Sequence, residues 1–110
     1  SYRRQRQMCI RDSTMHYRIT KVNHEAGKRD QFVEILRKKE ELINSFEGLN
    51  YVRMIAVSDT VTIAISEYDS EEKLKAVEGR FKEIMMDMVP LMSGPPEVLN
   101  GDSFWEKVLK

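Results

Sequence analysis

The sequence has few of the residues that form covalent or metal-bound sites. Its 110 residues include one cysteine, Cys9, two histidines and one tryptophan. A single cysteine forms no disulfide within the chain, and it forms no Cys-x-x-Cys redox or zinc motif. The two histidines, His16 and His24, have no carboxylates beside them at metal-ligand spacing. We therefore expect no metal site and no cofactor.

The sequence also lacks long apolar runs. No stretch approaches the roughly 20 apolar residues that are needed to cross a bilayer. The arginines near the start are not followed by the apolar segment of a secretory signal. These absences predict a cytoplasmic protein that does not bind membranes.

Residues 1–13, SYRRQRQMCIRDS, differ from the rest of the chain. They include four arginines and show no apolar periodicity. The run MCIRDS resembles a translated sequencing adapter, and the alternative is a basic arm for nucleic acid or membrane. We expect an artefactual or disordered tail here, followed by one domain over residues 14–110.

The charge of the expected domain argues against nucleic acid as a partner. The whole chain has 18 basic and 18 acidic residues, and without the four arginines and one aspartate of residues 1–13 it has 14 and 17, a net charge of −3. A mildly acidic domain is a poor partner for phosphate backbones. On the predicted third strand, Thr62, Ala64 and Ser66 also offer no aromatic side chains on which RNA bases could stack.

Alternating apolar residues predict four strands, at 15–22, 51–57, 60–68 and 97–108. The last strand contains Asn100-Gly101, where we expect an interruption. Between the strands, the apolar spacing changes from two residues to the three or four that are typical of helices.

Helical spacing predicts one helix over residues 28–46 and a second that ends near Val89. Asp69 is the expected N-cap of the second helix, with Glu72 completing a capping box, and Pro90 ends the pattern. The resulting βαββαβ order predicts a ferredoxin-like α+β fold. In this fold two helices cover one face of a four-stranded antiparallel sheet.

The second and third predicted strands form a hairpin around Ser58-Asp59. A two-residue loop there places three apolar pairs on one face, which we expect to contact the helices. The turn is not of the strongly specifying Asn-Gly type, and a slip of one residue would exchange the two faces. The three expected pairs are Ala56–Val61, Met54–Ile63 and Val52–Ile65.

The sheet face away from the helices is the predicted site. His16 is the candidate general base, since imidazole is the side chain that most often takes up a proton in catalysis. The candidate ligand-binding residues on this face are Arg18, Arg53 and Thr62, since buried arginines need carbonyl or anionic partners. The alternatives are a solvated face, or a dimer contact in which the arginines pair with acids of a second chain. By alternation, the polar residues of this face are His16, Arg18, Thr20, Arg53, Thr62 and Ser66.

The closing stretch PLMSGPPEVLNGDSFWE, residues 90–106, resembles the antibiotic biosynthesis monooxygenases, a family of dimeric α+β barrels. A helix that ends in Pro-Leu is followed by Gly-Pro-Pro-Glu-Val and a final strand with an aromatic pair. The resemblance covers residues 15–108, by pattern more than by identity. It implies a homodimer whose sheets pack face to face, with a cavity between helices and sheet or at the dimer-facing sheet.

The resemblance leaves the reaction open, because the family includes several activities. Its haem-degrading members use a histidine on the second helix, with an asparagine and a tryptophan. Here residues 70–93 contain no histidine and Trp105 is the single tryptophan, which argues against haem degradation. Asn23 matches the asparagine position and remains a candidate ligand-binding residue. The remaining interpretations are cofactor-independent oxygenation of a small anionic or phenolic molecule, and a non-catalytic dimeric ligand-binding or accessory domain.

Overall fold

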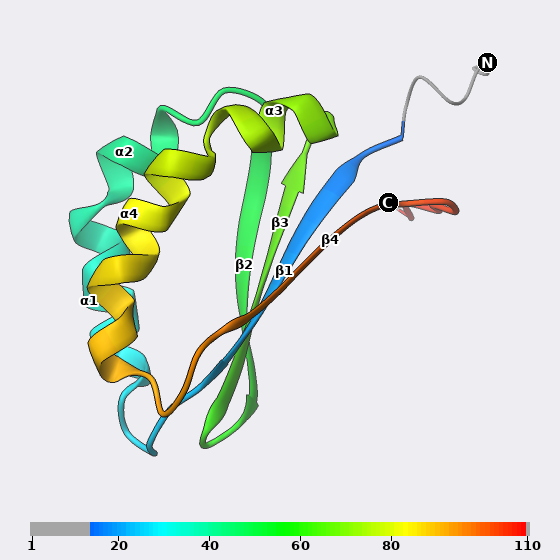
Figure 1. Ribbon diagram of the computed structural model, residues 1–110. Helices are drawn as coiled ribbons and strands as arrows, with labels where there is room; N and C mark the ends of the chain where they lie inside the picture. Colours follow the sequence, from blue (N-terminus) through cyan, green and yellow to red (C-terminus); the bar gives the residue numbers. More distant parts are fainter. Residues whose placement is uncertain (1–13, 110) are drawn as a thin grey trace.

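Two helical segments pack on one face of a four-stranded antiparallel sheet (Figure 1). The arrangement comes from a computed structural model, which describes residues 14–109. The expected tail, residues 1–13, lies outside the described residues. The sheet has the order β2-β3-β1-β4, and the predicted ferredoxin-like α+β fold is confirmed. Its strands are β1 (His16–Asn23), β2 (Leu49–Ser58), β3 (Val61–Tyr68) and β4 (Glu97–Asp102).

Each of the two predicted helices is interrupted once. The first consists of α1 (Arg29–Lys38) and α2 (Glu40–Asn44), and the second of α3 (Glu71–Ala76) and α4 (Glu78–Met88). After α4 the 3-10 turn η2 (Val89–Leu91) contains Pro90, whose ring cannot continue a helix.

Ser70 caps α3, and the predicted Asp69 cap is wrong by one residue. The backbone of Ser70 is extended, and its hydroxyl accepts a hydrogen bond from the backbone N–H of Lys73 at 3.2 Å. This bond satisfies one of the free N–H groups at the start of the helix.

The hairpin is one residue out of the predicted register. Val52 pairs with Ser66, and Met54 pairs with Ala64. The irregularity between Ala56 and Ser58 adds one residue to β2, as a β-bulge does. Because side chains alternate along a strand, the slip turns Ile63 away from the helices and turns the polar residues of β3 toward them.

The core lies between the helical layer and the sheet. Burying a large apolar side chain contributes roughly 1.5–3 kcal/mol relative to leaving it in water. The buried cluster includes residues of β1, β3, α1, α3 and α4, and one residue that follows each of α2 and α3. It consists of Val22, Phe32, Phe46, Tyr68, Leu74, Val77, Ile84 and Met88.

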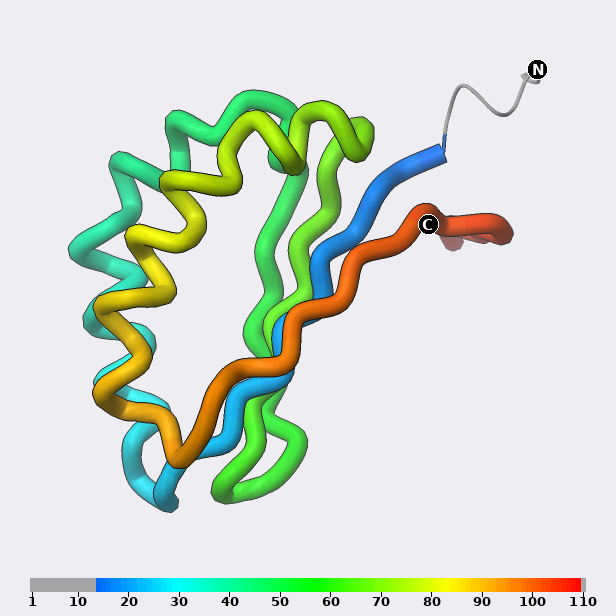
Figure 2. The backbone as a smooth tube through the Cα atoms, in the orientation of Figure 1, coloured from blue at the N-terminus to red at the C-terminus, as the bar shows by residue number. Residues whose placement is uncertain are grey.

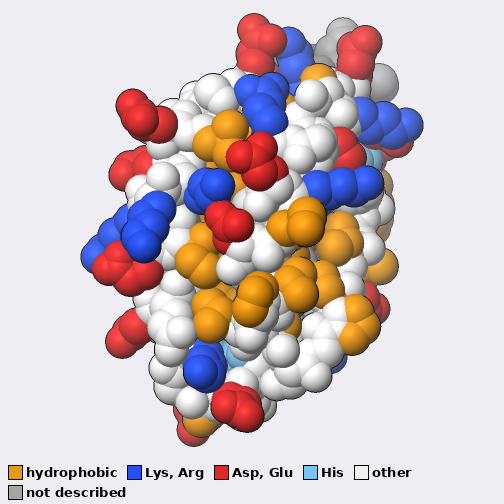
Figure 3. Space-filling view, turned by 60° about the vertical axis from the view of Figure 1, so that its left-hand side comes forward, with side chains coloured by type: hydrophobic (Ala, Val, Ile, Leu, Met, Phe, Trp, Pro, Cys, Tyr) orange, Lys and Arg blue, Asp and Glu red, His pale blue; other side chains and the backbone are white. Residues whose placement is uncertain are grey.

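The outer surface of the helical layer is largely charged. Figure 3 shows acidic and basic side chains interspersed there, with a group of apolar side chains among them. Lys39 Nζ lies 3.1 Å from an oxygen of Asp87 and 3.8 Å from one of Glu83, which links the two helical segments. Such solvated ion pairs contribute little stability.

The last strand is shorter than predicted. It ends at Asp102 and continues through Asn100 and Gly101, both paired with β1, so the expected interruption is wrong. Figure 2 shows the first and last described segments running together at one end of the sheet. Phe104 and Trp105 lie beyond the strand, and the Trp105 side chain is 74% exposed.

Candidate functional site

A cavity lies between the helical layer and the sheet. The centre of a water molecule can occupy a volume of about 70 Å³ within this cavity. One water needs roughly 10–15 Å³ on this scale and fills about 30 Å³ of liquid, so the space matches roughly five waters or one substituted aromatic ring. Most of the wall is apolar and includes three methionines, which adapt to ligand shape. The polar residues of the wall are Arg18, Thr20, Thr62, Ser66 and Tyr68.

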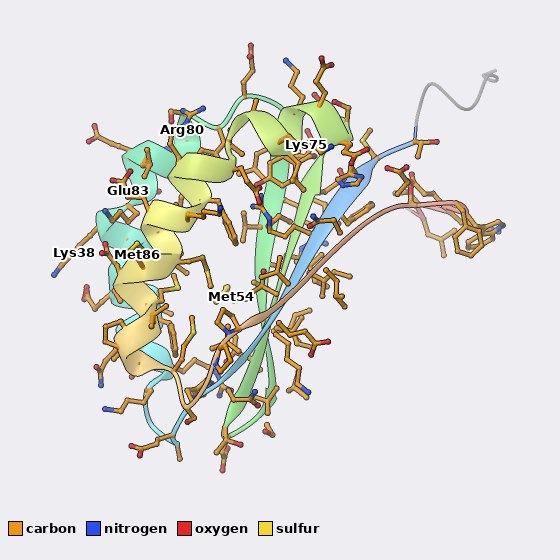
Figure 4. The ribbon with its side chains drawn as sticks, viewed as in Figure 1. Lys38, Met54, Lys75, Arg80, Glu83 and Met86 are labelled. Atoms are coloured by element: carbon orange, nitrogen blue, oxygen red, sulfur yellow. The ribbon has the colours of Figure 1, made fainter. Side chains whose placement is uncertain are left out.

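The cavity opens along the edge strand β2. Val52 and Met54 line it and are nevertheless exposed to solvent. Figure 4 shows Met54 in the space between α4 and the sheet, while Met86 lies on the outer side of α4. A surface groove between α1, α2 and β2 is adjacent to the cavity, and the two share the wall residues Leu36, Ile43, Phe46, Leu49 and Val52.

Arg18 is the charged residue of the cavity wall, with a side chain that is 1% exposed. Its Nη1 donates to the hydroxyl of Tyr68 at 3.0 Å, and its Nη2 donates to a carboxylate oxygen of Glu78 at 2.5 Å. Its guanidinium carbon lies 3.6 Å from the centroid of the Phe81 ring, a cation–π contact. The buried Nε has no hydrogen-bond partner among residues 14–109. The Nε–H donor of this residue is therefore unused.

Tyr68 is a second polar group of the same wall. Burial raises the pKa of its phenol above the ordinary 10.0, and the Glu78 carboxylate acts in the same direction, whereas the Arg18 guanidinium opposes them. The hydroxyl therefore keeps its proton at neutral pH. It accepts a hydrogen bond from Arg18 and can donate its own proton to a ligand oxygen.

His16 forms a pair with Asp102 of β4. Its Nδ1 lies 2.6 Å from a carboxylate oxygen of Asp102, which fixes the proton on Nδ1. Its buried Nε2 has no partner in the described part of the chain. A histidine held by a carboxylate in this way can accept a proton at Nε2. His16 shares a face of β1 with Arg18, but it is not part of the cavity wall.

His24 is buried. Its Nδ1 lies 2.9 Å from the backbone oxygen of Glu25, which requires a donor, so Nε2 accepts from the hydroxyl of Thr62 at 2.8 Å. Arg29 Nε donates to the same hydroxyl at 3.1 Å. These bonds close the end of the cavity beside Phe32, whose ring centroid is 5.3 Å from that of His24.

The structure does not bring all the predicted site residues together. Arg18 and Thr62 line the cavity. They lie on the sheet face toward the helices, whereas we had expected them on the face away from the helices. Arg53 lies on the outer face, with its guanidinium 4.3 Å from the ring of Tyr51. Asn23 is exposed and lies outside the cavity wall. Arg53 is on the face where we expected it, and the register of the hairpin separates it from Thr62, which lies on the opposite face.

Two residues of the site, Glu78 and Phe81, were missed in the sequence, and Tyr68 was not expected beside Arg18. Tyr68 follows Ser66 by two positions on β3, so the correct register would have placed it beside Arg18. Glu78 and Phe81 are three residues apart on α4 and therefore project from one side of the helix. Nothing in their spacing indicates that the partner is an arginine 60 residues earlier.

The structure gives little support for other kinds of site. Within residues 14–109, no group of three or more histidine, cysteine, aspartate or glutamate side chains is arranged to hold a metal ion. No helix in the same part of the chain is long and apolar enough to span a membrane.

Comparison with known proteins finds similarity in structure alone. The sequence matches no protein-family model and no curated protein. A monooxygenase of Streptomyces coelicolor in complex with the ligand nanaomycin D matches with a TM-score of 0.72 and 16% identity, over 92% of this chain and 96% of that one. A dimeric ferredoxin-like protein from an uncultured marine organism matches with a TM-score of 0.73 and 14% identity, over 90% and 96%.

A protein of Caulobacter crescentus, provisionally named an antibiotic biosynthesis monooxygenase, matches with a TM-score of 0.69 and 18% identity, over 86% of this chain and 93% of that one. Identities this low establish the fold and leave the activity open. The chain therefore has the ferredoxin-like fold that is found in proteins named antibiotic biosynthesis monooxygenases, and it resembles them along nearly its whole described length.

Proposed function

We propose that the chain binds a small ring compound in the cavity between helices and sheet and oxygenates it without a cofactor. The observation that supports this is a mainly apolar cavity of single-ring size with the buried Arg18 in its wall. A structure of the same fold, the Streptomyces coelicolor monooxygenase, holds a ligand. The proposed substrate class is a phenolic small molecule that also carries a carbonyl or ether oxygen, since such an oxygen can accept a hydrogen bond from Arg18 or Tyr68.

The proposed reaction uses dioxygen as the oxidant and needs no reductant. With a phenol, one atom of dioxygen enters the ring to give a quinone, and the other leaves as water with the two hydrogens that the ring and hydroxyl lose. The phenol must first give up its proton, which makes the ring electron-rich. The apolar wall keeps water from the reactive intermediates.

His16 is the proposed proton acceptor. Asp102 holds its Nδ1 and leaves Nε2 free, and His16 is paired across the sheet with Tyr68 of the cavity wall. Replacing His16 by glutamine should lower turnover while ligand binding stays unchanged. Equal turnover in the His16→Gln variant would remove this residue from the mechanism.

Oxygen consumption by the purified full chain tests the proposed activity. We expect consumption that depends on a phenolic substrate and persists with a metal chelator, and label from heavy-oxygen dioxygen should appear in the product. Met86→Ala, a change on the outer side of α4, is the control variant. Absence of label from the product with every phenol tested would contradict the oxygenase.

A second candidate function is binding without catalysis. It is favoured by the position of His16 outside the cavity wall. A ligand at 100 times its Kd stabilises the folded protein by roughly 2.7 kcal/mol. Thermal stabilisation without oxygen consumption would therefore support a binding or accessory domain.

We also propose that the chain forms a homodimer through the outer face of the sheet. This face has an apolar centre, which is exposed at Ile19, Ile55 and Leu99 and partly exposed at Ile63 and Ile65. Ile19 lies between Ile65 and Leu99 across the strands, so the apolar side chains are contiguous. Contiguous apolar patches of this kind mark contact surfaces. A matching fold is named as dimeric, which supports a second copy as the partner.

A further inference from the structure

We infer that Glu78 makes Arg18 selective for neutral carbonyl or ether oxygens over anions. This inference rests on the proposed function, because it concerns the ligand of the same cavity. The donor atom is Arg18 Nε, and Glu78 is the residue that sets the preference of this donor for neutral acceptors.

The unused donor is the first observation. Arg18 is 1% exposed, and its Nε is buried without a hydrogen-bond partner among residues 14–109. A buried polar atom that lacks a partner is costly, and native proteins rarely leave one without a reason. The residue is part of the cavity wall. A ligand oxygen beside Nε would supply the missing acceptor.

The charge of Arg18 is the second observation. Its Nη2 already bonds the Glu78 carboxylate at 2.5 Å, and Nη1 bonds the neutral hydroxyl of Tyr68 at 3.0 Å. Because Nε and Nη2 belong to the same planar guanidinium, an anion on Nε would lie close to the Glu78 carboxylate. Two carboxylates beside one guanidinium repel each other; the 41% exposure of the Glu78 side chain weakens this repulsion, and the 1% exposure of Arg18 preserves part of it.

A neutral acceptor avoids this repulsion. A carbonyl oxygen accepts the Nε–H hydrogen bond, adds no charge and leaves the Glu78 pair in place. The ring to which the carbonyl is attached would occupy the apolar part of the cavity, which has the size of one substituted ring. The Arg18–Glu78 pair therefore favours a ligand in which the hydrogen-bond acceptor is attached to an uncharged ring.

Three single-ring probes of similar size test the inference at pH 7: acetophenone, benzoate and ethylbenzene. Binding to the full chain is followed by NMR at two places. The Nε–H signal of Arg18 reports the donor, and the methyl signals of Met54 and Met88 report occupation of the cavity. Because binding is measured directly, the result does not depend on turnover.

We expect acetophenone to bind more tightly than both other probes and to shift the Arg18 Nε–H signal. Ethylbenzene should shift the methionine methyls and leave that signal in place. Glu78→Gln should improve benzoate binding about tenfold or more and change acetophenone binding little. Glu72→Gln, which removes an exposed carboxylate from α3, is the matched control and should change neither.

The possible failures are distinguishable. Benzoate binding as tight as acetophenone binding, or unchanged by Glu78→Gln, would overturn the role of Glu78. Equal binding of acetophenone and ethylbenzene would overturn the role of Nε, although the cavity would still be a ring-binding site. If none of the probes shifts the methionine methyls, the inference and the proposed ligand site both fail.

Discussion

Arg18 and Ile19 are consecutive residues of β1 with opposite surroundings. The side chain of Arg18 is 1% exposed in the cavity wall, and Ile19 is 38% exposed on the outer face of the sheet. The backbone of one central strand thus holds both the candidate ligand site and the candidate dimer surface. A second chain that packs on Ile19 would stiffen the strand that carries Arg18, so loss of the dimer should weaken ligand binding as well.

Ile55→Lys is expected to break the proposed dimer and leave each subunit folded. A lysine in the centre of an apolar interface loses its hydration without gaining a partner. Light scattering across a range of protein concentrations measures the change in mass. Met86→Lys is the control, because Met86 is apolar and 72% exposed but lies on the helical layer. A monomer in the unmodified protein at micromolar concentration would contradict the interface.

Ile63→Asp should leave the subunit folded, whereas Leu74→Asp should unfold it. Ile63 faces away from the helices and is partly exposed, so an aspartate there remains in contact with water in the monomer. Leu74 is buried in the core, where an unpaired carboxylate costs several kcal/mol of a total stability of about 5–15 kcal/mol. Circular dichroism and urea unfolding measure both variants. An unfolded Ile63→Asp protein would mean that the hairpin register is wrong.

Gly48→Ala should destabilise the protein more than Gly27→Ala. Both glycines have a positive φ, 88° and 87°, which costs an alanine roughly 1–2 kcal/mol. A Cβ at Gly48 would also lie 2.7 Å from the Cβ of Lys73, so α3 would have to shift, while nothing lies within 4 Å of a Cβ at Gly27. We expect a loss of about 1 kcal/mol at Gly27 and at least about twice that at Gly48. Equal losses in urea unfolding would show that the contact with Lys73 is relieved without cost.

Tyr68 should make stability fall as the pH rises above about 10. Its pKa in the folded state is raised, so between the ordinary value of 10.0 and the folded value the folded chain holds a proton that the unfolded chain has lost. The free energy of unfolding therefore decreases with pH in this window, and the contribution is complete below it. Tyr68→Phe should flatten this part of the profile. An unchanged slope between pH 9 and 11 would assign the fall to other groups.

The order of strands and helices was predictable from the sequence because it depends on local patterns. Apolar spacing of two residues identified all four strands, and spacing of three or four identified both helical segments. The resemblance of residues 90–106 to one family also agrees with the fold of the matching structures. The exact ends were less accurate, as at Ser70, because several neighbouring residues are good caps.

The faces of the sheet were decided by tertiary structure. A two-residue loop at Ser58-Asp59 would pair Ala56 with Val61. Ala56 instead pairs with Thr62, and a bulge in β2 accommodates the extra residue. Val61, Ile63 and Ile65 are apolar, and Thr62 and Ser66 on the other face are polar, so the pattern alone favours burying Ile63 and Ile65. The fold instead exposes them on the outer face, which is consistent with a surface that a second copy would cover.

The amino-acid sequence by itself therefore determined the fold class, and it singled out Arg18 and Thr62 but placed them on the wrong face of the sheet. Only the folded chain determined that Arg18 meets Glu78 and Phe81, since contacts between a strand and a helix 60 residues later leave no periodic signal. Local patterns record which residues prefer burial, because burial depends on each side chain's own polarity. The packing of distant elements decides which residues meet, and among residues 14–109 it leaves the Nε of Arg18, a residue of the cavity wall, without a hydrogen-bond partner.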